Sequence, residues 1–266
     1  MHDISDEMGT FLFDKIIFGP VKSRRLGISL GINLLPADRK ICSFDCIYCE
    51  CGRNAGNKIS GSKLPERSEV RERLQEILFK MKEKQQLPDV ITFAGNGEPT
   101  LHPDFPAIID DTVVIRDLFA PGARIAVLSN ATMLHKKEIF EALLKVDDNI
   151  QKIDSGLQET IRLVDCPPGN FSLEKAVAQL AGFKGRVIIQ TMFIKGTYRE
   201  GEIDNTTPAE IDSWLKILKK IGPEKVMIYT IDRDTPVESL QKVPLSELHR
   251  IADLVKSEGF RVQVSG

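Results

Sequence analysis

Four cysteines lie together between residues 42 and 51, and their spacing is the clearest sign of chemistry in this sequence. The segment 41–52 reads ICSFDCIYCECG, which spaces Cys42, Cys46 and Cys49 as C-x3-C-x2-C. A loop of this size can wrap one cuboidal iron–sulfur cluster, with three thiolates on three of its irons. The fourth iron would remain open to an exchangeable ligand, which indicates catalysis rather than electron transfer alone.

Two other interpretations of these cysteines remain open. A structural zinc ion would need a fourth ligand, which Cys51 could supply, although Cys49 and Cys51 are close together for such a site. Buried thiols without a metal are the other alternative. Clustered cysteines do not resemble the spread-out framework of a small disulfide-bonded secreted protein. We expect Cys51 and Cys166 to be ordinary thiols.

A second candidate segment, 92–102, reads TFAGNGEPTLH and runs from a strand-like stretch into a glycine-rich turn. Glycines such as Gly97 let the backbone approach a ligand closely. The carboxylate of Glu98 suits the ammonium group of a ligand, whereas on its own it would be an ordinary loop carboxylate. Asp154 and Gln190 end or occupy later strands, and polar side chains inside a barrel are costly unless they bind a ligand or each other.

The elements that must position these residues alternate between strands and helices. Short apolar runs predict buried strands, and apolar residues at helical spacing predict helices. The strands are expected at 28–34, 90–94, 125–128, 150–153, 187–193 and 226–231, and the helices at 66–84, 105–119, 135–145, 172–183, 208–221 and 245–258. This alternation predicts an α/β fold with a parallel sheet, either an open barrel or a doubly wound sheet. In both folds the polar residues after the strands meet at one rim.

Length and composition fit one soluble α/β domain spanning 1–266, with no repeat or low-complexity linker. The formal net charge of −2 gives no overall basic field that would attract nucleic acid. The first residues are acidic where a signal peptide is basic, and no run reaches about 18 apolar residues. We therefore expect a cytoplasmic protein that does not bind a membrane.

With these motifs, the chain resembles the radical S-adenosylmethionine (SAM) superfamily. In that family an aromatic residue precedes the third cysteine and lies near the adenine of SAM, and Tyr48 occupies this position. The turn at 95–99 is similar to the family's Gly-Gly-Glu-Pro motif, with Asn96 in place of the first glycine of the pair. The resemblance implies a 4Fe-4S cluster on Cys42, Cys46 and Cys49. It also implies SAM contacts from the residues Tyr48, Gly97, Glu98, Ser129, Asn130, Asp154 and Gln190. For Ser129 a helix-capping role is nearly as good an interpretation.

Further segments between residues 18 and 236, among them FGPVKSRRLGISLGINLLP, KIDSGLQET and YTIDRDTP, are similar to the superfamily branch that includes wyosine base synthases. This resemblance implies a partial (β/α)6 barrel, an open parallel sheet with outer helices. Wyosine synthases carry a second cluster on three upstream cysteines, and here no cysteine precedes Cys42. The resemblance therefore does not extend to their reaction.

The implied reaction is reductive cleavage of SAM to a 5'-deoxyadenosyl radical, which abstracts a hydrogen atom from the substrate. Candidate substrate contacts are Arg24, Arg25, Lys195 and Arg233, because guanidinium and ammonium groups pair with carboxylate or phosphate. We expect an anionic small molecule or nucleoside-like substrate, with RNA possible but less favoured, and a flavodoxin or ferredoxin as reductant. A cluster-bearing redox sensor or carrier is the main alternative, and a zinc-stabilised binding module is the third.

Overall fold

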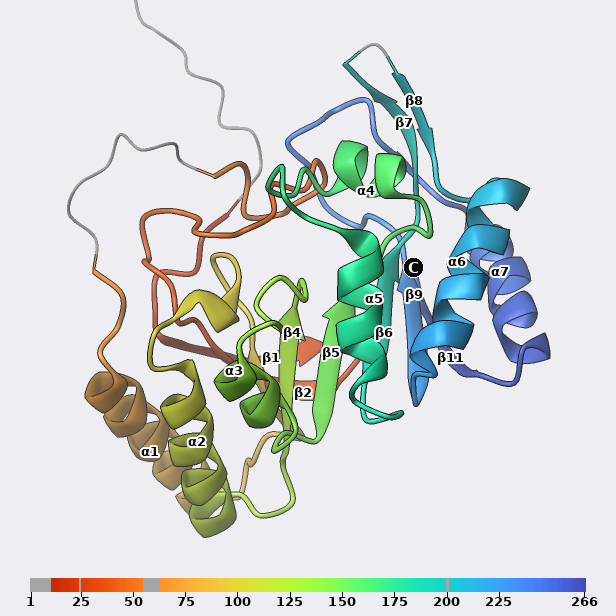
Figure 1. Ribbon diagram of the computed structural model, residues 1–266. Coiled ribbons are helices and arrows are strands. Elements are labelled where there is room, and N and C mark those ends of the chain that lie inside the picture. Colours follow the sequence, from red (N-terminus) through yellow and green to blue (C-terminus); the bar gives the residue numbers. More distant parts are fainter. Residues whose placement is uncertain (1–10, 24, 55–62, 200) are drawn as a thin grey trace, which may run out of the picture.

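The protein is built on an eight-stranded sheet that curls into a half-barrel with helices around its outside (Figure 1). The computed structural model describes residues 11–23, 25–54, 63–199 and 201–266. The spatial order of the strands is β1-β2-β3-β4-β5-β6-β9-β11, and all neighbours are parallel except the antiparallel pair β1 and β2. The strands are β1 (Ile17–Ser23), β2 (Gly27–Ile32), β3 (Val90–Phe93), β4 (Arg124–Ser129), β5 (Asp148–Lys152), β6 (Ile188–Met192), β9 (Lys225–Tyr229) and β11 (Arg261–Ser265).

The helices follow the strands in the expected alternation and confirm the prediction of a partial α/β barrel. They are α1 (Arg67–Glu83), the 3-10 helix η1 (Pro99–Leu101), α2 (Phe105–Phe119), α3 (Lys137–Leu143), α4 (Gln158–Val164), α5 (Leu173–Ala181), α6 (Pro208–Ile221) and α7 (Leu245–Ser257). All six expected strands and all six expected helices are present, with ends that differ by a few residues. The sequence patterns missed β1, β11, η1 and the short helix α4, and they also missed the strands of the small sheet described next.

A small antiparallel sheet extends the structure beyond the C-terminal end of β6. It consists of β7 (Ile194–Tyr198), β8 (Gly201–Asp204) and β10 (Gln241–Lys242), in the order β10-β7-β8. Its β7 begins two residues after the last residue of β6, so this sheet stands on the side where the parallel strands end (Figure 1). Active sites of barrel and open-sheet enzymes lie on that side.

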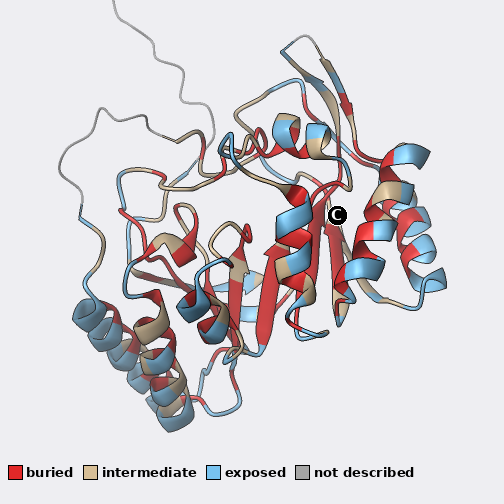
Figure 2. Cartoon of the chain, viewed as in Figure 1, coloured by how far each residue is buried: buried red, intermediate tan, exposed pale blue. Residues whose placement is uncertain are grey.

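Alternating side chains divide each parallel strand between the barrel interior and the outer core, since neighbouring residues of a strand point to opposite faces. On β3, Val90 points into the barrel, whereas Ile91 and Phe93 pack beneath the helices. Most strand residues are therefore buried on both faces of the sheet (Figure 2). The apolar layer inside the barrel consists of Leu26, Val90, Ala126, Ile150, Ile188 and Met227.

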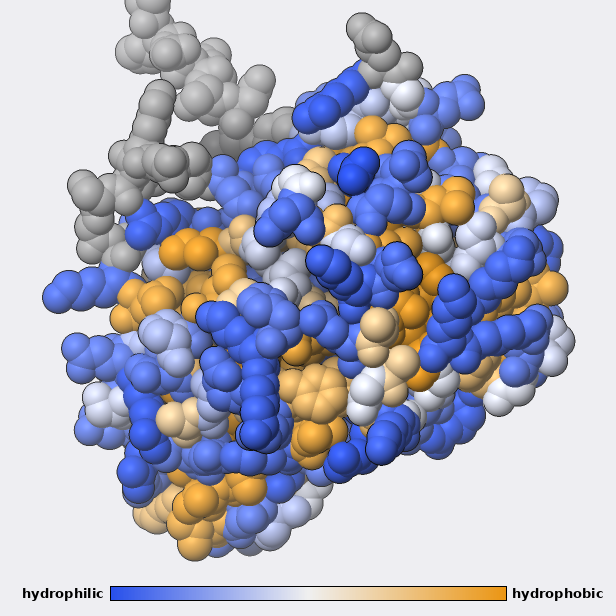
Figure 3. All heavy atoms as spheres, in the orientation of Figure 1, coloured by the Kyte–Doolittle hydropathy of each residue, from blue (hydrophilic) through white to orange (hydrophobic). Residues whose placement is uncertain are grey.

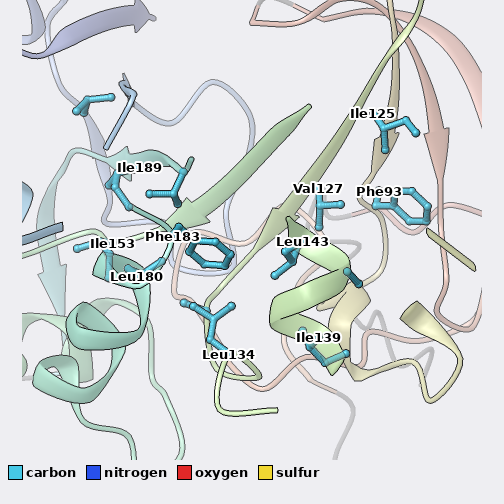
Figure 4. Packing of buried hydrophobic residues seen from close by; sticks show 14 of the residues in the cluster. Phe93, Ile125, Val127, Leu134, Ile139, Leu143, Ile153, Leu180, Phe183 and Ile189 are labelled. Atoms are coloured by element: carbon cyan, nitrogen blue, oxygen red, sulfur yellow. The ribbon is translucent and has the colours of Figure 1, made fainter. Parts of the chain in front are cut away.

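The outer core lies between the sheet and the helices that cover it. Figure 4 shows strand residues such as Phe93 and Val127 facing Leu143 and Ile139 of α3. Helix α1 reaches this core with Val70, Leu74, Leu78 and Met81, whose spacing places them on one face. The buried residues thus recur at the helical spacing that predicted this helix from the sequence.

Phe183 provides a test of how much this outer core contributes to stability. Its ring is 1% exposed and stacks on Phe140 with 4.1 Å between ring centroids. We expect Phe183→Ala to lower the free energy of unfolding by roughly 3–5 kcal/mol, because truncation of a buried aromatic leaves a cavity. Leu118→Ala, at a side chain that is 61% exposed on α2, should change it by less than about 0.5 kcal/mol. Urea unfolding measures both, and equal losses would contradict the packing argument.

The surface is mostly polar. Hydrophilic side chains cover much of the face seen in Figure 3, with apolar residues between them. In the described part of the chain, no helix is long and apolar enough to cross a membrane.

Candidate active site

The cysteine loop is joined by its backbone to the glycine-rich turn that follows β3. The amide of Ile41 donates to the carbonyl of Asn96 at 2.9 Å, and the amide of Glu98 donates to the carbonyl of Ile41 at 3.1 Å. These two hydrogen bonds form a parallel bridge between Ile41 and Gly97. The two motifs that the sequence singled out, about 50 residues apart, are therefore held side by side at the ends of β2 and β3.

The three thiols of Cys42, Cys46 and Cys49 gather in one apolar cluster with Phe44 and Ile47. Burial raises the pKa of Cys42 to about 12 and that of Cys46 well above its usual range. The pKa of Cys49 is instead lowered to about 6, chiefly by a hydrogen bond from Cys51 and, against burial, by the ammonium of Lys40. Ionising the first two thiols thus requires a strong local cation, which iron would supply.

Within the described ranges, no three cysteine, histidine or carboxylate side chains come close enough to ligate a single metal ion. In a cuboidal cluster each thiolate binds a different iron, so three ligands need not meet at one ion. The donor set fits such a cluster, because the three thiols belong to one loop and gather in one cluster of side chains.

Lys40 and Asn54 shape the loop that carries the cysteines. The Asn54 side chain accepts from the amide of Cys42 at 3.1 Å and donates to the carbonyls of Cys42 and Phe44 at 3.1 and 2.9 Å. The ammonium of Lys40 is buried, donates to the carbonyl of Gly52 at 2.9 Å and pairs with Asp45. These two residues close the loop at both ends, and no periodicity or spacing in the sequence marks them.

The remaining cysteines have other partners. The thiol of Cys51 donates to the carbonyl of Gly95 at 3.3 Å, and its pKa is raised, mainly by the hydrogen bond that it makes to Cys49. Cys166 is half-buried, and its thiol lies 3.5 Å from the carbonyl of Leu163. Cys51 is thus next to the predicted ligands and Cys166 belongs to the end of α4.

Gly97 allows the turn to touch the cysteine loop. Its φ is +136°, and a Cβ at this position would lie 1.8 Å from the carbonyl oxygen of Ile41. The neighbouring Asn96, which departs from the family motif, is fully buried and donates to the carbonyls of Phe13 and Pro36 at 2.9 and 2.7 Å. Asparagine at this position ties two other segments to the turn, which a glycine could not do.

Glu98 links the turn to the end of β4. One carboxylate oxygen accepts from the amide and hydroxyl of Thr100 at 3.1 and 2.5 Å, and the other accepts from the amide of Asn130 at 2.7 Å. The side chain is 2% exposed, and burial raises its pKa despite these hydrogen bonds. A cationic group beside Glu98 would offset this burial cost.

Ser129 and Asn130 lie at the same rim, directly at the end of β4. The side-chain amide nitrogen of Asn130 lies 3.5 Å from the sulfur of Cys42 and donates to the hydroxyl of Ser43 at 2.9 Å. The hydroxyl of Ser129 accepts from the amide of Ala131 at 3.2 Å. Ser129 therefore makes a local turn contact and does not cap a helix, since α3 begins only at Lys137 with Lys136 at its N-cap, while Asn130 reaches the cysteine loop.

Tyr48 and Asp154 meet inside the barrel mouth, together with Lys152, which the sequence reasoning missed. The Tyr48 hydroxyl donates to Asp154, and the Lys152 ammonium contacts both groups. Lys152 is two residues after Ile150 on β5 and so faces the barrel interior. The argument that drew attention to Asp154 and Gln190, an inward polar side chain on a barrel strand, applies equally to Lys152.

Gln190 pairs in register with Lys152 across β5 and β6, and its side chain is 7% exposed. Its backbone carbonyl accepts from the amide of Ile153 at 3.0 Å. The side chain lies two residues above Ile188 of the inner apolar layer, so it also points into the barrel. Gln190 and Lys152 thus form part of a polar layer above an apolar floor.

The four candidate substrate contacts differ in what surrounds them. Arg24 lies outside the described residues. Arg25 stacks over the ring of Tyr229 at 4.5 Å from its centroid, and its Nη1 atom is buried without a hydrogen-bond partner in the described part of the chain. Lys195 pairs with Glu247 at 2.9 Å and also with Asp204, and Arg233 pairs with Glu50 at 2.9 Å. Arg25 is therefore the candidate best suited to an incoming anion.

Sequence comparison finds relatives across most of the chain. Residues 40–160 match the family described as the radical SAM superfamily. A UPF0026 protein of Methanocaldococcus jannaschii is 30% identical over 237 residues, which cover 88% of this chain and 68% of that protein. A protein of Brachyspira hyodysenteriae named GTPase Obg is 33% identical over 240 residues, 89% of this chain. The present chain spans only 33% of the length of that relative.

Several solved structures share the fold of this chain. A radical SAM methyltransferase from Sphaerobacter thermophilus gives a TM-score of 0.64 at 11% identity, covering 89% of this chain and 65% of that one. TYW1 with a lysine-pyruvate adduct bound gives 0.61 at 16% identity, covering 86% and 73%. The protein anSMEcpe with bound AdoMet gives 0.56 at 13% identity, covering 88% and 63%. At these identities the likeness concerns the fold.

Proposed function

Because this chain belongs to the radical SAM superfamily, with UPF0026 proteins as its relatives, we propose that it is an enzyme that cleaves SAM by radical chemistry and that Cys42, Cys46 and Cys49 hold a 4Fe-4S cluster. The observation that carries the proposal is the single loop that gathers the three thiols and is joined by backbone hydrogen bonds to the turn at Gly97 and Glu98. When bound, the cluster would supply the electron that cleaves SAM to methionine and a 5'-deoxyadenosyl radical. The protein's own residues would bind and orient the two reactants.

On the SAM side, Glu98 would pair with the methionine ammonium, since its carboxylate is buried and no ion pair among the described residues engages it. Asn130 would offer its amide to the polar atoms of the ribose or carboxylate, with Ser129 shaping the turn beside it. Tyr48 would lie along the adenine, with its hydroxyl held by Asp154. Gln190 would present its side-chain amide from the barrel wall, and Gly97 would keep the backbone close to the ligand.

For the substrate we propose an anionic small molecule or a nucleoside-like compound. The support is Arg25, whose buried and unpartnered Nη1 in the described structure is costly unless an anion binds there. Radical SAM enzymes act on small molecules, peptides or RNA. RNA is the less favoured class here, because the net charge of −2 gives no basic field for phosphates. A flavodoxin or ferredoxin would supply the electron.

The experiment that tests this function is anaerobic. The protein is reconstituted with iron and sulfide, mixed with SAM and dithionite, and the products are measured by mass spectrometry. We expect 5'-deoxyadenosine and methionine in equal amounts, with about four irons per chain. If no 5'-deoxyadenosine forms while the irons are bound, the cluster belongs to a sensor or electron carrier, and the SAM contacts proposed above are wrong.

Glu98→Gln tests the proposed ammonium contact. The variant keeps the size of the side chain but removes its charge, and a hydrogen bond to a charged group contributes about 1.5–3 kcal/mol. We expect an intact cluster and SAM binding weakened roughly tenfold to a hundredfold, measured by equilibrium dialysis without reductant. Glu247→Gln, at the Lys195 ion pair, is the matched control. Unchanged SAM affinity in Glu98→Gln would remove Glu98 from the site.

A further inference from the structure

Lys152 carries a largely buried charge inside the barrel, and the reaction proposed above assigns it no role. Its side chain is 16% exposed, and its ammonium lies 2.6 Å from a carboxylate oxygen of Asp165 and in contact with Asp154. Both carboxylates are 1% exposed. The ammonium also lies 4.4 Å from the centroid of the Tyr48 ring and contacts its hydroxyl. A charge kept so far from water is costly and is retained here by two carboxylates.

The same group is tied to the middle of the cysteine loop. The residues on either side of Cys46 are fixed by backbone hydrogen bonds, from the amide of Asp45 to the carbonyl of Asp165 at 3.0 Å and from that of Ile47 to Val164 at 2.9 Å. Tyr48, which Lys152 contacts directly, stands between Cys46 and Cys49 in sequence. The Lys152 ammonium is therefore one side-chain contact away from the loop that carries the three cysteines.

We propose that the Lys152 ammonium, balanced by Asp165 and Asp154, sets the reduction potential of the cluster. This inference rests on the proposed cluster and extends it. Reduction adds one electron to the cluster, and net charge and exposure around a cluster determine its potential. In a poorly solvated site a nearby cation stabilises the reduced state, whereas a nearby carboxylate destabilises it. Lys152 would make the cluster easier to reduce, and Asp165 would oppose this effect. Lys152 would therefore act on the cluster through its charge, without touching the reacting atoms.

Three variants separate the charge from the packing. Lys152→Met removes the cation, Lys152→Arg keeps it, and Asp165→Asn removes the opposing anion with almost no change in size. The potential of the reconstituted cluster is measured by an electron paramagnetic resonance redox titration without SAM. The titration is made at pH 9, because burial raises the pKa of Asp165 to about 8 and its carboxylate is charged above that pH. Lys152 stays charged there, since the two carboxylates outweigh burial and raise its pKa well above the usual range.

We expect Lys152→Met to lower the equilibrium constant for reduction at least tenfold, a shift of −59 mV for a one-electron couple. Asp165→Asn should shift the potential in the opposite direction by a similar amount, and Lys152→Arg should stay within threefold of the wild type. Equal potentials in all four proteins with full iron content would overturn the inference, as would shifts of the same sign in Lys152→Met and Asp165→Asn. If Lys152→Met loses its cluster, the Lys152→Arg and Asp165→Asn results decide alone. A wild-type protein that binds no cluster would instead overturn the proposed function itself.

Discussion

Cys46→Ala is expected to abolish cluster binding and, with it, all cleavage of SAM. Cys46 is the middle cysteine of the motif, is 8% exposed, and lies in the same apolar cluster as Cys42 and Cys49. With only two thiolates left, the site falls below the three that the proposed cluster needs, so iron and sulfide should not be retained after reconstitution. Iron and sulfide content, together with the visible absorbance, measure this loss. SAM binding and 5'-deoxyadenosine formation should disappear together.

Two other cysteines of the chain serve as controls for this result. Cys166→Ala should leave iron content and spectrum unchanged, because its thiol lies at the end of α4 near the carbonyl of Leu163. Cys51→Ala should also keep about four irons, although its thiol lies beside Cys49 and contacts the carbonyl of Gly95. Loss of iron in Cys51→Ala, or retention of the full cluster in Cys46→Ala, would contradict our assignment of the ligands.

The barrel could be predicted from the sequence because its strands are short apolar runs and its helices carry apolar faces. The run 90–94 became β3, and the pattern at 208–221 became α6 with the predicted ends. The edge and extension strands gave no such signal. β1 has mostly exposed residues, and β7 and β8 contain glycine and charged residues. β7 and β8 are held by pairing with each other rather than by burial, so they need no apolar run. Helix α4, only seven residues long, is too short for a clear periodicity.

The motif residues could be grouped at one rim from the sequence because parallel strands end on the same side. The structure brings Asn130 to Cys42 and to Glu98, and Tyr48 to Asp154. Residues that hold the cysteine loop by hydrogen bonds to its backbone could not be found this way. The role of Asn54 depends on where the loop folds back, which no pattern of residue types encodes.

The family resemblance could mark an unusual residue but could not say what that residue does. It identified Asn96 as a departure from the motif, but only the fold reveals that the side chain bridges Phe13 and Pro36. The substrate candidates were proposed from charge alone. Ion pairs now engage Lys195 and Arg233 at the surface, whereas Arg25 stacks over the half-buried ring of Tyr229. Charge in a sequence predicts a possible contact, and the partners that the fold provides decide whether the charge is available.

Gly97→Ala is expected to separate the two halves of the candidate site. A Cβ at Gly97 would lie 1.8 Å from the carbonyl oxygen of Ile41, which is backbone and cannot rotate away. The φ of +136° is in addition unfavourable for alanine. The cysteine loop would have to move and break the Ile41–Gly97 bridge. We expect a loss of about 3 kcal/mol in the free energy of unfolding, a cluster that binds incompletely, and SAM affinity reduced more than in Glu98→Gln.

Gly122→Ala is the matched control, because a Cβ there would meet no heavy atom of the described residues within 4 Å apart from its own chain neighbours, and its φ is not positive. Its free energy of unfolding should stay within about 0.5 kcal/mol of the wild-type value, and it should keep its iron. The comparison also distinguishes a general loss of stability from a local one. Phe183→Ala removes a similar amount of stability from a core far from the loop in sequence, so it should retain the cluster below its unfolding midpoint. If Gly97→Ala binds iron and SAM like Gly122→Ala, the contact between the cysteine loop and the turn is not what assembles the site.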